Sequence, residues 1–327
     1  MKAIINGKIL LRNEVLENKV LVFDKKIIDI TDEVPSECEV IDVKGKLVSP
    51  GLIDIHIHGN MGKDTMEGTD EAIDIISKSV ARHGVTSYLP TTMTMDEESI
   101  LKALESIRRG MNRSTEGARV IGAHLEGPFI NKIYKGAQNG NYITNPNYEL
   151  VKNYEDVIIV ITYAPEEDLD FTFTKSIKSN TNIVLSIGHS AATFIEAREA
   201  IRLGASNITH TFNGMTGLNH RDPGVVGAAL TTDAYCEFIC DTIHITKDLF
   251  QFILDSKGKE RVVLITDSME AGGLENGTYS LGGQAVIVKD GAARLENGSL
   301  AGSVSSLNNM VKNFYKNTNL NINEAIH

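Results

Sequence analysis

The sequence has 327 residues, of which 42% are hydrophobic and 23% charged, and its formal net charge is −11 at pH 7. This length and composition predict a globular protein with a full core, and the negative charge argues against a nucleic-acid surface, which normally requires a basic face. The longest apolar runs are far shorter than the roughly 18 residues of a membrane span, so we expect no membrane partner.

The cysteines and the start of the chain indicate a compartment. Cys38, Cys236 and Cys240 form neither a CxxC pair nor an even disulfide framework, which is typical of a reducing environment. The first ten residues, MKAIINGKIL, contain no long apolar stretch, so we expect no secretory signal. We expect a cytoplasmic enzyme.

Residues 1–49 predict a small, β-sandwich-like subdomain of short strands joined by turns. Asn6-Gly7 is a pair that type I′ hairpin turns favour, and Asp24-Lys25-Lys26 separates two apolar runs. Ser49-Pro50-Gly51 is predicted to be the hinge into a second unit, residues 50–327.

From residue 51 onward, short apolar runs alternate with helical patterns. Ile73, Ile76 and Val80 fall on one helical face, and Asp96 is predicted to cap the following helix. Eight such units predict an α/β fold, a (β/α)8 TIM-like barrel, rather than a doubly wound sheet. The predicted strands are 51–56, 85–89, 119–124, 156–162, 182–188, 206–210, 235–241 and 261–266.

The pattern after residue 267 is rich in turns and resembles β-structure. Asn276-Gly277 and Asn297-Gly298 are predicted to be turns of a β-hairpin insertion around residues 274–300. The last segment is predicted to begin with a helix whose apolar face carries Leu307, Met310, Val311 and Phe314.

Side chains that bind divalent metals recur where predicted strands end. His56 and His58 lie in PGLIDIHIHG, Glu126 in HLEGP, His189 in LSIGHS and His210 in ITHTFNGM. In a (β/α)8 barrel, functional residues come from the carboxyl ends of several strands and converge on one face. The ligand types predict one or two divalent ions, with zinc first and iron or manganese also compatible.

Each histidine also has a purely structural interpretation. A single histidine is more often a hydrogen-bonded structural residue than a metal ligand, and we apply this interpretation to His83, His124 and His327. For the four histidines at strand ends, their joint placement favours metal binding. Glu126 supports this, because a buried carboxylate requires a cation or donors nearby.

Asp267 ends the eighth predicted strand, after the apolar run Val262-Val263-Leu264-Ile265. A carboxylate at this place can accept a proton from water and return it to a leaving group. A helix-capping role is disfavoured because Gly272-Gly273 follows so soon. Ser190 does not predict a serine hydrolase, because GHSAA lacks the second glycine of a nucleophile elbow.

The sequence resembles the amidohydrolase superfamily, and within it the N-acetylglucosamine-6-phosphate deacetylase family. The matching segments stand in the family's order and cover nearly the whole chain: PGLIDIHIHG (50–59), HLEGPF (124–129), KGAQ (135–138), IGHS (187–190), THTFNGM (209–215), HRDPG (220–224), CDTIHI (240–245), LITDS (264–268) and RLENGSLAGS (294–303). The HxH pair alone is weak evidence for this family, whereas the ordered set of segments is highly specific to it.

The resemblance implies deacetylation of N-acetyl-D-glucosamine 6-phosphate to D-glucosamine 6-phosphate and acetate. It implies that Glu126, His189 and His210 hold the main ion and that Asp267 is the general base and then the acid. A second ion would be held at His56 and His58. The implied substrate contacts are Ala137, Gln138, Asn213, Gly214, Arg221, His244, Leu300, Ala301 and Gly302.

The resemblance also implies a homodimer in which Arg221 reaches the phosphate bound by the neighbouring subunit. A guanidinium in a loop after the sixth strand can grip a phosphate bidentately. Two departures affect these expectations. Many family members carry histidine where Gln138 stands, and members usually continue beyond the position of His327 with further helix and strands, so we expect the C-terminal strands of the β-subdomain to be missing.

Two alternatives remain open. The first is another amidohydrolase reaction, such as deacetylation of the galactosamine isomer or hydrolysis of a cyclic amide. The region DVIIVITYAP lacks the fourth-strand lysine that many cyclic-amide relatives place between two metals. The second is a barrel that has lost catalysis, which is disfavoured because all six candidate side chains are present.

Overall fold

The computed structural model describes residues 1–327, and the chain divides into two compact units. Met1–Gly51 and Asn319–His327 form the first unit, and Leu52–Thr318 form the second. The sequence interpretation assigned residues 319–327 to the barrel unit. They associate with the N-terminal segment instead, where the Asn323 side chain in helix α9 (Ile322–Ile326) donates a hydrogen bond to the carbonyl of Leu11 over 2.7 Å.

The first unit contains two small sheets. One has the order β5-β4-β1-β6, and the other has the order β3-β2-β7. Ala3, Val20 and Val22 form a small buried core beneath the larger sheet. The strands are β1 (Lys2–Ile5), β2 (Lys8–Leu10), β3 (Val15–Leu16), β4 (Val20–Phe23), β5 (Ile27–Thr31), β6 (Glu39–Asp42) and β7 (Leu47–Val48).

The two turn signals in this unit have different outcomes. Residues Asp24–Lys26 join β4 and β5 in an antiparallel pair, as the two apolar runs on either side of them indicate. The type I′ prediction at Asn6-Gly7 is wrong, because β1 and β2 belong to different sheets. A type I′ turn requires positive φ at both central residues, and of this pair only Asn6 has it, at 55°.

The second unit contains two parallel sheets whose strands follow the chain order. One has the order β12-β11-β8, and the other runs from β13 to β18 without a crossover. Isolated parallel bridges link Thr91 with His124 and Ile57 with Ser268. The strands are β8 (Leu52–Ile57), β11 (Val85–Pro90), β12 (Arg119–Val120), β13 (Ala123–Glu126), β14 (Ile158–Tyr163), β15 (Val184–Ile187), β16 (Asn207–Ile208), β17 (Tyr235–Phe238) and β18 (Val262–Leu264).

These strands correspond to the eight predicted runs, with one difference. The third predicted strand, 119–124, is divided into β12 and β13 around Gly122, whose φ is 153°. The β9 (Gly59–Asn60) and β10 (Lys63–Asp64) pair is a short antiparallel addition after β8. Parallel strands in chain order, alternating with helices, are the arrangement of a TIM-barrel type of fold.

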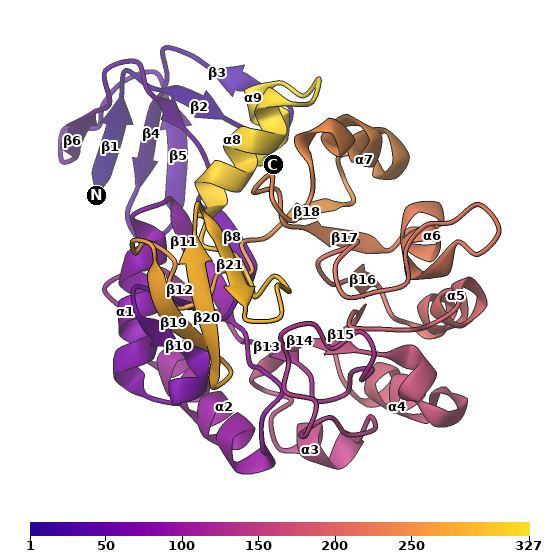
Figure 1. Cartoon of the computed structure of the whole chain (residues 1–327). Helices are drawn as coiled ribbons and strands as arrows, with labels where there is room; N and C mark the ends of the chain where they lie inside the picture. The colour runs from indigo at the N-terminus through magenta and orange to yellow at the C-terminus, as the bar shows by residue number, and fades with distance from the viewer. The chain divides into compact units, whose positions relative to one another are not determined.

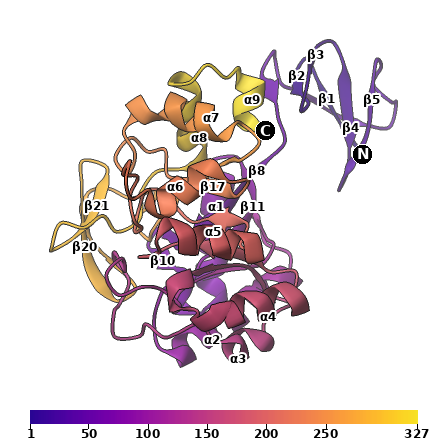
Figure 2. The same ribbon diagram turned by 90° about the vertical axis from the view of Figure 1, so that its right-hand side faces the viewer.

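Helices cover the outside of these strands (Figure 1). Figure 2 views the second unit from the side of α4 to α7 and shows that they form its outer layer. The helices are α1 (Asp70–Ala81), α2 (Glu97–Asn112), α3 (Tyr148–Lys152), α4 (Thr172–Asn180), α5 (Phe194–Leu203), α6 (Gly224–Thr231), α7 (Phe250–Lys257) and α8 (Leu307–Lys316). None of the helices has both the length and the apolar character that a membrane crossing requires.

The helices form where the sequence places an apolar face behind a cap. Ile73, Ile76 and Val80 of α1 are buried, and each contributes roughly 1.5 to 3 kcal/mol by leaving water. Asp96 caps α2 as predicted, accepting a hydrogen bond from the Ser99 amide over 2.9 Å. The apolar face predicted for residues 307–314 is buried in α8.

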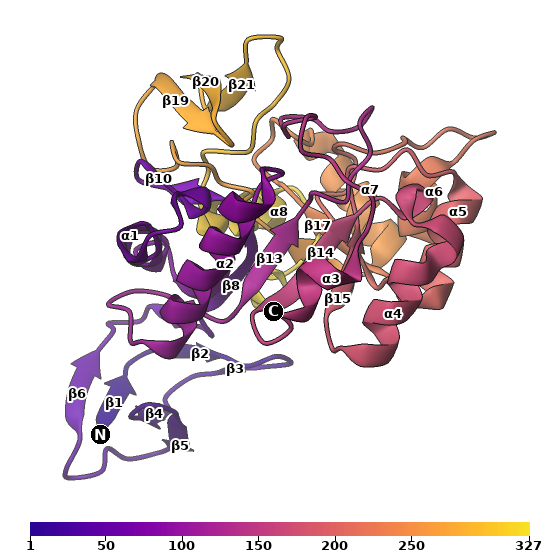
Figure 3. The ribbon, with the colours of Figure 1, turned by 90° about the horizontal axis from the view of Figure 1, so that it is seen from below.

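The insertion near residues 274–300 is a three-stranded antiparallel sheet rather than one hairpin. Its strands are β19 (Gly277–Leu281), β20 (Gln284–Lys289) and β21 (Ala292–Leu295), and Figure 3 shows this sheet standing off one end of the unit's strands. The turns lie at Gly282-Gly283 and Asp290-Gly291, where all four residues have positive φ. The turn prediction at Asn276-Gly277 is wrong because Gly277 already begins β19, whereas Asn297-Gly298 lies in a turn.

Candidate active site

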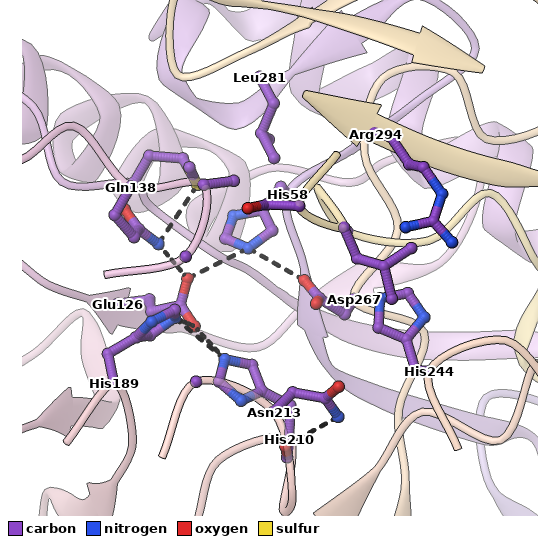
Figure 4. Close-up of a pocket in the computed structure, with 17 residues that line it drawn as sticks. His58, Glu126, Gln138, His189, His210, Asn213, His244, Asp267, Leu281 and Arg294 are labelled. Carbon is purple, nitrogen blue, oxygen red and sulfur yellow. Dashed lines mark hydrogen bonds and ion pairs between the residues drawn. The ribbon is translucent and has the colours of Figure 1, made fainter. Parts of the chain in front are cut away.

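Six side chains from five strand ends form one cluster, with the carboxylate of Glu126 at its centre. His56 lies in β8, His58 follows it directly, and Glu126 ends β13. His189, His210 and Asp267 follow β15, β16 and β18 within a few residues. Figure 4 shows the imidazole of His58 on one side of Glu126 and those of His189 and His210 on the other.

Glu126 is the centre of this cluster and is almost fully buried. Its Oε1 lies 3.1 Å from Nε2 of His210, 3.3 Å from Nε2 of His189 and 3.4 Å from Nε2 of His56. Its Oε2 lies 3.3 Å from Nε2 of His58. One carboxylate therefore faces four imidazole nitrogens of the same kind.

The other ring nitrogen of three of these histidines contacts a hydrogen-bond acceptor. Nδ1 of His58 lies 3.3 Å from the carbonyl of Thr91, and Nδ1 of His189 lies 2.8 Å from that of Tyr134. Nδ1 of His56 lies 3.1 Å from the Glu237 carboxylate. Because these oxygens only accept, each Nδ1 donates to them, so Nε2 is the ring nitrogen that can bind a metal once its proton has left, as metal ligands require.

The donor set fits a divalent ion. Nε2 of His56 is buried without a hydrogen-bond partner, and Nε2 of His189 lies 3.1 Å from Nε2 of His210. Lone pairs at such distances repel unless a cation or a proton lies between them. Of the three groups whose ligand atoms lie within 4.8 Å of one another, two contain Glu126, namely His56-His58-Glu126 and Glu126-His189-His210, and the third is His56-His124-Glu237. Glu126 belongs to the first two, so the set has room for one ion or for two that share it.

The cluster holds positive charge strongly. Burial by itself would lower the pKa of His58, but hydrogen bonds to Asp267 and Glu126 and their charges raise it to about 9. Burial likewise opposes the charged form of His56, but Glu126 and Asp267 raise the pKa of His56 well above its ordinary value. Burial would raise the pKa of Glu126, but the neighbouring His56 and His189 hold it well below its usual range.

Asp267 faces the two histidines of the first strand. Its Oδ1 lies 3.2 Å from Nε2 of His58 and 3.5 Å from Nε2 of His56. Burial would raise the pKa of Asp267, but the charges of these histidines and the hydrogen bond to His58 lower it to about 2. The carboxyl group is therefore ionised at neutral pH and is able to accept a proton.

Three site residues have left-handed backbone conformations that are rare outside glycine. The φ angle is 47° at His189, 28° at His210 and 47° at Asp267. Such conformations cost roughly 1 to 3 kcal/mol each and persist only where the surroundings enforce them. At Asp267 the backbone is held by its own amide bond to His56 and by the Ser303 amide bonded to its carbonyl, at 2.9 and 2.7 Å. The strand ends therefore turn sharply and direct these side chains to one point.

A pocket of about 410 Å³ opens onto the cluster. Most residues of the sequence-based site line it, whereas His56 is buried beneath it and Ala301 is buried beside it. Arg221 is exposed and lies outside this pocket. The predicted site residues that line it are His58, Glu126, Ala137, Gln138, His189, His210, Asn213, Gly214, His244, Asp267, Leu300 and Gly302.

Gln138 and His124 have structural partners. The Gln138 side chain donates to Oε2 of Glu126 over 2.5 Å and accepts from the Thr94 amide over 2.6 Å, so its amide supports Glu126. His124 contacts the carbonyl of Ile55 and the hydroxyl of Thr162 at 3.0 and 2.7 Å, and burial lowers the pKa of His124 to about 4. His124 is therefore a neutral structural residue beneath the cluster.

His244 is oriented by Asp241. Its Nδ1 lies 2.7 Å from Oδ2 of Asp241, while the other Asp241 oxygen accepts from the amides of Ile243 and His244 over 2.8 Å each. Since the carboxylate fixes the proton on Nδ1, Nε2 is the nitrogen of His244 that remains for a ligand in the pocket.

Sequence reasoning missed residues that complete the site. Glu237 is fully buried in β17 and accepts from Asn207 over 2.7 Å while it contacts His56. The sequence feature that could have identified Glu237 is a single carboxylate within the apolar run AYCEFIC. Arg294, Ser299, Met93, Leu281 and Gly136 also line the pocket. Gly136, Arg294 and Ser299 lie in the matched segments KGAQ and RLENGSLAGS but were assigned no role, and no quoted motif contains Met93 or Leu281.

The raised pKa of His58 predicts how the metal-free protein responds to pH. A group whose pKa is about 9 when folded, against an ordinary value of about 6.5, stabilises the fold fully below pH 6.5. This contribution, of the order of 3 kcal/mol, disappears as the pH rises through about 9. We expect the melting temperature of chelator-treated protein to fall between about pH 7 and pH 9.5.

The same melting experiment with added Zn²⁺ or Mn²⁺ is the control. The ion then replaces the protons on the cluster, so the melting temperature should change much less over this range. Equal declines with and without metal would show that the cluster does not cause the pH dependence.

Comparisons with known proteins place this site among relatives. A model of the amidohydrolase family matches residues 47–318. The chain is 39% identical over 309 residues to an N-acetylglucosamine-6-phosphate deacetylase of Lysinibacillus sphaericus, covering 93% of this chain and 80% of the relative. It is 36% identical to an N-acetylgalactosamine-6-phosphate deacetylase of Escherichia coli O157:H7, covering 90% of this chain and 78% of the relative.

A solved structure shares the fold. The crystal structure of N-acetylglucosamine-6-phosphate deacetylase from Pasteurella multocida superimposes with a TM-score of 0.92 at 30% sequence identity. The match covers 99% of this chain and 86% of that chain.

Proposed function

We propose that this chain, which belongs to the amidohydrolase family, hydrolyses the acetamide of N-acetyl-D-glucosamine 6-phosphate to D-glucosamine 6-phosphate and acetate. The observation that carries the proposal is Glu126 surrounded by four imidazoles, with ionised Asp267 beside them at the floor of the pocket. A metal centre next to a free carboxylate is suited to the hydrolysis of an unactivated amide.

The residues have separate tasks in this reaction. Glu126, His189 and His210 would hold one divalent ion, and His56 and His58 would hold a second ion together with Glu126. When bound, such an ion lowers the pKa of water towards about 7 and polarises a carbonyl group. We propose zinc, which suits a set of nitrogen and carboxylate ligands.

Asp267 moves the proton. Its carboxylate accepts a proton from the attacking water as the water oxygen bonds to the acetyl carbon. It then donates that proton to the sugar nitrogen as the carbon–nitrogen bond breaks, so the amine leaves in neutral form. The contact between Oδ1 of Asp267 and Nε2 of His58, at 3.2 Å, keeps the carboxylate directed at the cluster.

The remaining pocket residues bind the sugar. Ala137, Asn213, Gly214 and the segment Leu300–Gly302 surround the cluster, and we propose that they contact the substrate. Gly214 cannot be replaced at low cost, because its φ is 59° and an added Cβ would lie 3.0 Å from Nδ1 of His189. Gln138 supports Glu126 rather than the sugar in this proposal.

We also propose the finer features that the family resemblance implies. The two parallel sheets would act as one closed (β/α)8 barrel, supported by the bridges at Thr91–His124 and Ile57–Ser268.

A homodimer would allow Arg221, which is exposed outside its own pocket, to reach the phosphate bound by the partner. The three free cysteines favour a reducing compartment.

Deacetylation of N-acetyl-D-galactosamine 6-phosphate is a second candidate, favoured by the 36% identity to a deacetylase of that name. The two sugars differ only in the configuration at C4, which the metal cluster does not contact in this scheme. One assay decides between them.

We expect purified protein to release acetate from both sugar phosphates only in the presence of bound metal, with the gluco isomer preferred at least about tenfold in kcat/KM. The measurement is acetate release from each isomer, together with metal analysis of the same protein before and after chelation. A preference for the galacto isomer would overturn the substrate assignment, and full activity after complete metal removal would overturn the reaction.

A further inference from the structure

We propose that Arg294 on β21 binds the phosphate of the substrate within its own chain and thereby selects phosphorylated sugars. This inference rests on the proposed function and deepens it. Arg294 matches none of the substrate contacts that the family resemblance implies. The structure places it in the pocket wall.

The net charge of the chain favours a cation where a phosphate binds at the mouth of the pocket. At the floor, Glu126 and Asp267 face the histidines of the cluster, whereas the whole chain has a net charge of −11. A phosphate dianion entering this field is repelled unless a positive group lies close to it. Apart from the histidines, Arg294 is the only cationic side chain among the residues that line the pocket.

The shape of the substrate separates the two charged ends. The acetamide on C2 and the phosphate on C6 leave opposite sides of the pyranose ring. With the acetamide at Asp267 and the cluster, the phosphate must lie towards the rim. Figure 4 shows Arg294 and His244 on the same side of the pocket, away from Gln138 and His189.

The Arg294 side chain is held in place while most of its donors remain available. Its Nη1 donates to the carbonyl of Gly298 over 2.9 Å, which is the one hydrogen bond that it makes, and it forms no ion pair. A guanidinium has five N–H donors in a planar fork that matches phosphate geometry. Without a competing carboxylate, the remaining donors are free for an anion.

The backbone around Arg294 is hydrogen-bonded on both sides and leads directly into the proposed substrate segment. Arg294 pairs with Ile287 of β20 and forms a bridge with Leu300. Amide bonds from Leu295 to Ser299 and from Ala301 to Ala293, at 2.9 and 3.0 Å, close this hairpin. Ala293 and Leu295 are buried in the core on one face of β21. Because side chains alternate along a strand, Arg294 points to the opposite face.

His244 lies on the same side of the pocket as Arg294 (Figure 4). Its Nδ1 is bonded to Asp241 over 2.7 Å, so Nε2 is the nitrogen that remains for a ligand. Arg294 therefore supplies the positive charge of the site, and His244 is a polar neighbour beside it.

The test measures equilibrium binding and turnover in metal-loaded protein. Arg294→Ala should weaken binding of D-glucosamine 6-phosphate by about 10- to 100-fold and raise KM for the acetylated substrate similarly, with kcat within about threefold. Binding of unphosphorylated D-glucosamine should not change. Arg294→Lys should recover part of the loss, since it restores the charge without the fork.

Lys289→Ala is the matched control. Lys289 is a cation of the neighbouring strand β20 that lies outside the pocket, so its removal should leave both measurements unchanged. Arg221→Ala is measured in parallel, because a phosphate site contributed only by the partner subunit would make this variant, and not Arg294→Ala, lose affinity.

The outcomes separate this inference from the proposed reaction. If wild-type protein binds sugar phosphates through Arg294 but releases no acetate, the reaction assignment fails and the phosphate site stands. If Arg294→Ala binds D-glucosamine 6-phosphate within about threefold of wild type, the inference is wrong whatever the activity. Equal losses for phosphorylated and unphosphorylated sugars would also overturn it, because they would indicate a structural effect.

Discussion

Replacing Asp267 by asparagine is expected to leave the metal bound and to reduce kcat by about 10²- to 10⁴-fold, the range that a positioned proton acceptor contributes. Asparagine has nearly the same shape as aspartate, but its amide oxygen does not accept a proton at neutral pH. Asp267 lies beside His56 and His58, while Glu126, His189 and His210 form a complete ligand group without it. The expected defect is therefore in turnover rather than in metal content.

Three measurements on the Asp267→Asn protein make this prediction specific. Metal analysis should give the wild-type stoichiometry, the melting temperature should show an intact fold, and acetate release should be nearly absent. Asp255→Asn, the same chemical change on the exposed face of α7, serves as the control and should be fully active. Activity within about tenfold of wild type in Asp267→Asn would remove the general-base assignment.

Replacing Glu126 by glutamine is expected to remove both metal and activity. Glu126 is the carboxylate shared by the two ligand groups His56-His58-Glu126 and Glu126-His189-His210. Its two oxygens lie within 3.4 Å of four imidazole nitrogens. Glutamine keeps the volume but loses the negative charge, and its amide NH2 would direct hydrogens at one of the ions and repel it. We expect bound metal to fall below about one tenth of an equivalent per chain and activity to fall by at least about 10³-fold.

The Glu126→Gln experiment requires a separation of folding from metal binding. The melting temperature of this variant should no longer rise on addition of Zn²⁺, whereas that of wild type should. Glu199→Gln, at a half-exposed position of α5 that pairs with Arg202, is the matched control and should retain metal and activity. A Glu126→Gln protein with a full complement of metal would show that the histidines suffice and that Glu126 is not the shared ligand.

Local turn signals were less reliable than side-chain periodicity. Asn6-Gly7 and Asn276-Gly277 were predicted to be hairpin turns, yet the turns of the inserted sheet form at Gly282-Gly283 and Asp290-Gly291. All of these pairs are suited to the turn. Which of them is used depends on where the flanking strands bury their apolar faces, which is a tertiary choice.

The sequence by itself determined the order of the strands, the faces of the helices and the chemical types at the strand ends. These features depend on neighbouring residues, because burial along one strand or helix leaves a periodicity that can be read locally. The apolar faces of α1 and α8 and the cap at Asp96 are of this kind. The ligand types at His56, His58 and Glu126 also needed only the motifs in which they stand.

Only the tertiary structure decided how the side chains of the site are oriented. The left-handed backbone at His189, His210 and Asp267 is unfavourable locally and is enforced by contacts from other strands. The proton on His56 is fixed by Glu237, 181 positions away, and Glu126 is supported by Gln138. Arg294 entered the pocket because its hairpin folds back over it. Contacts between distant residues carry no local periodicity, so they become visible only once the chain has folded.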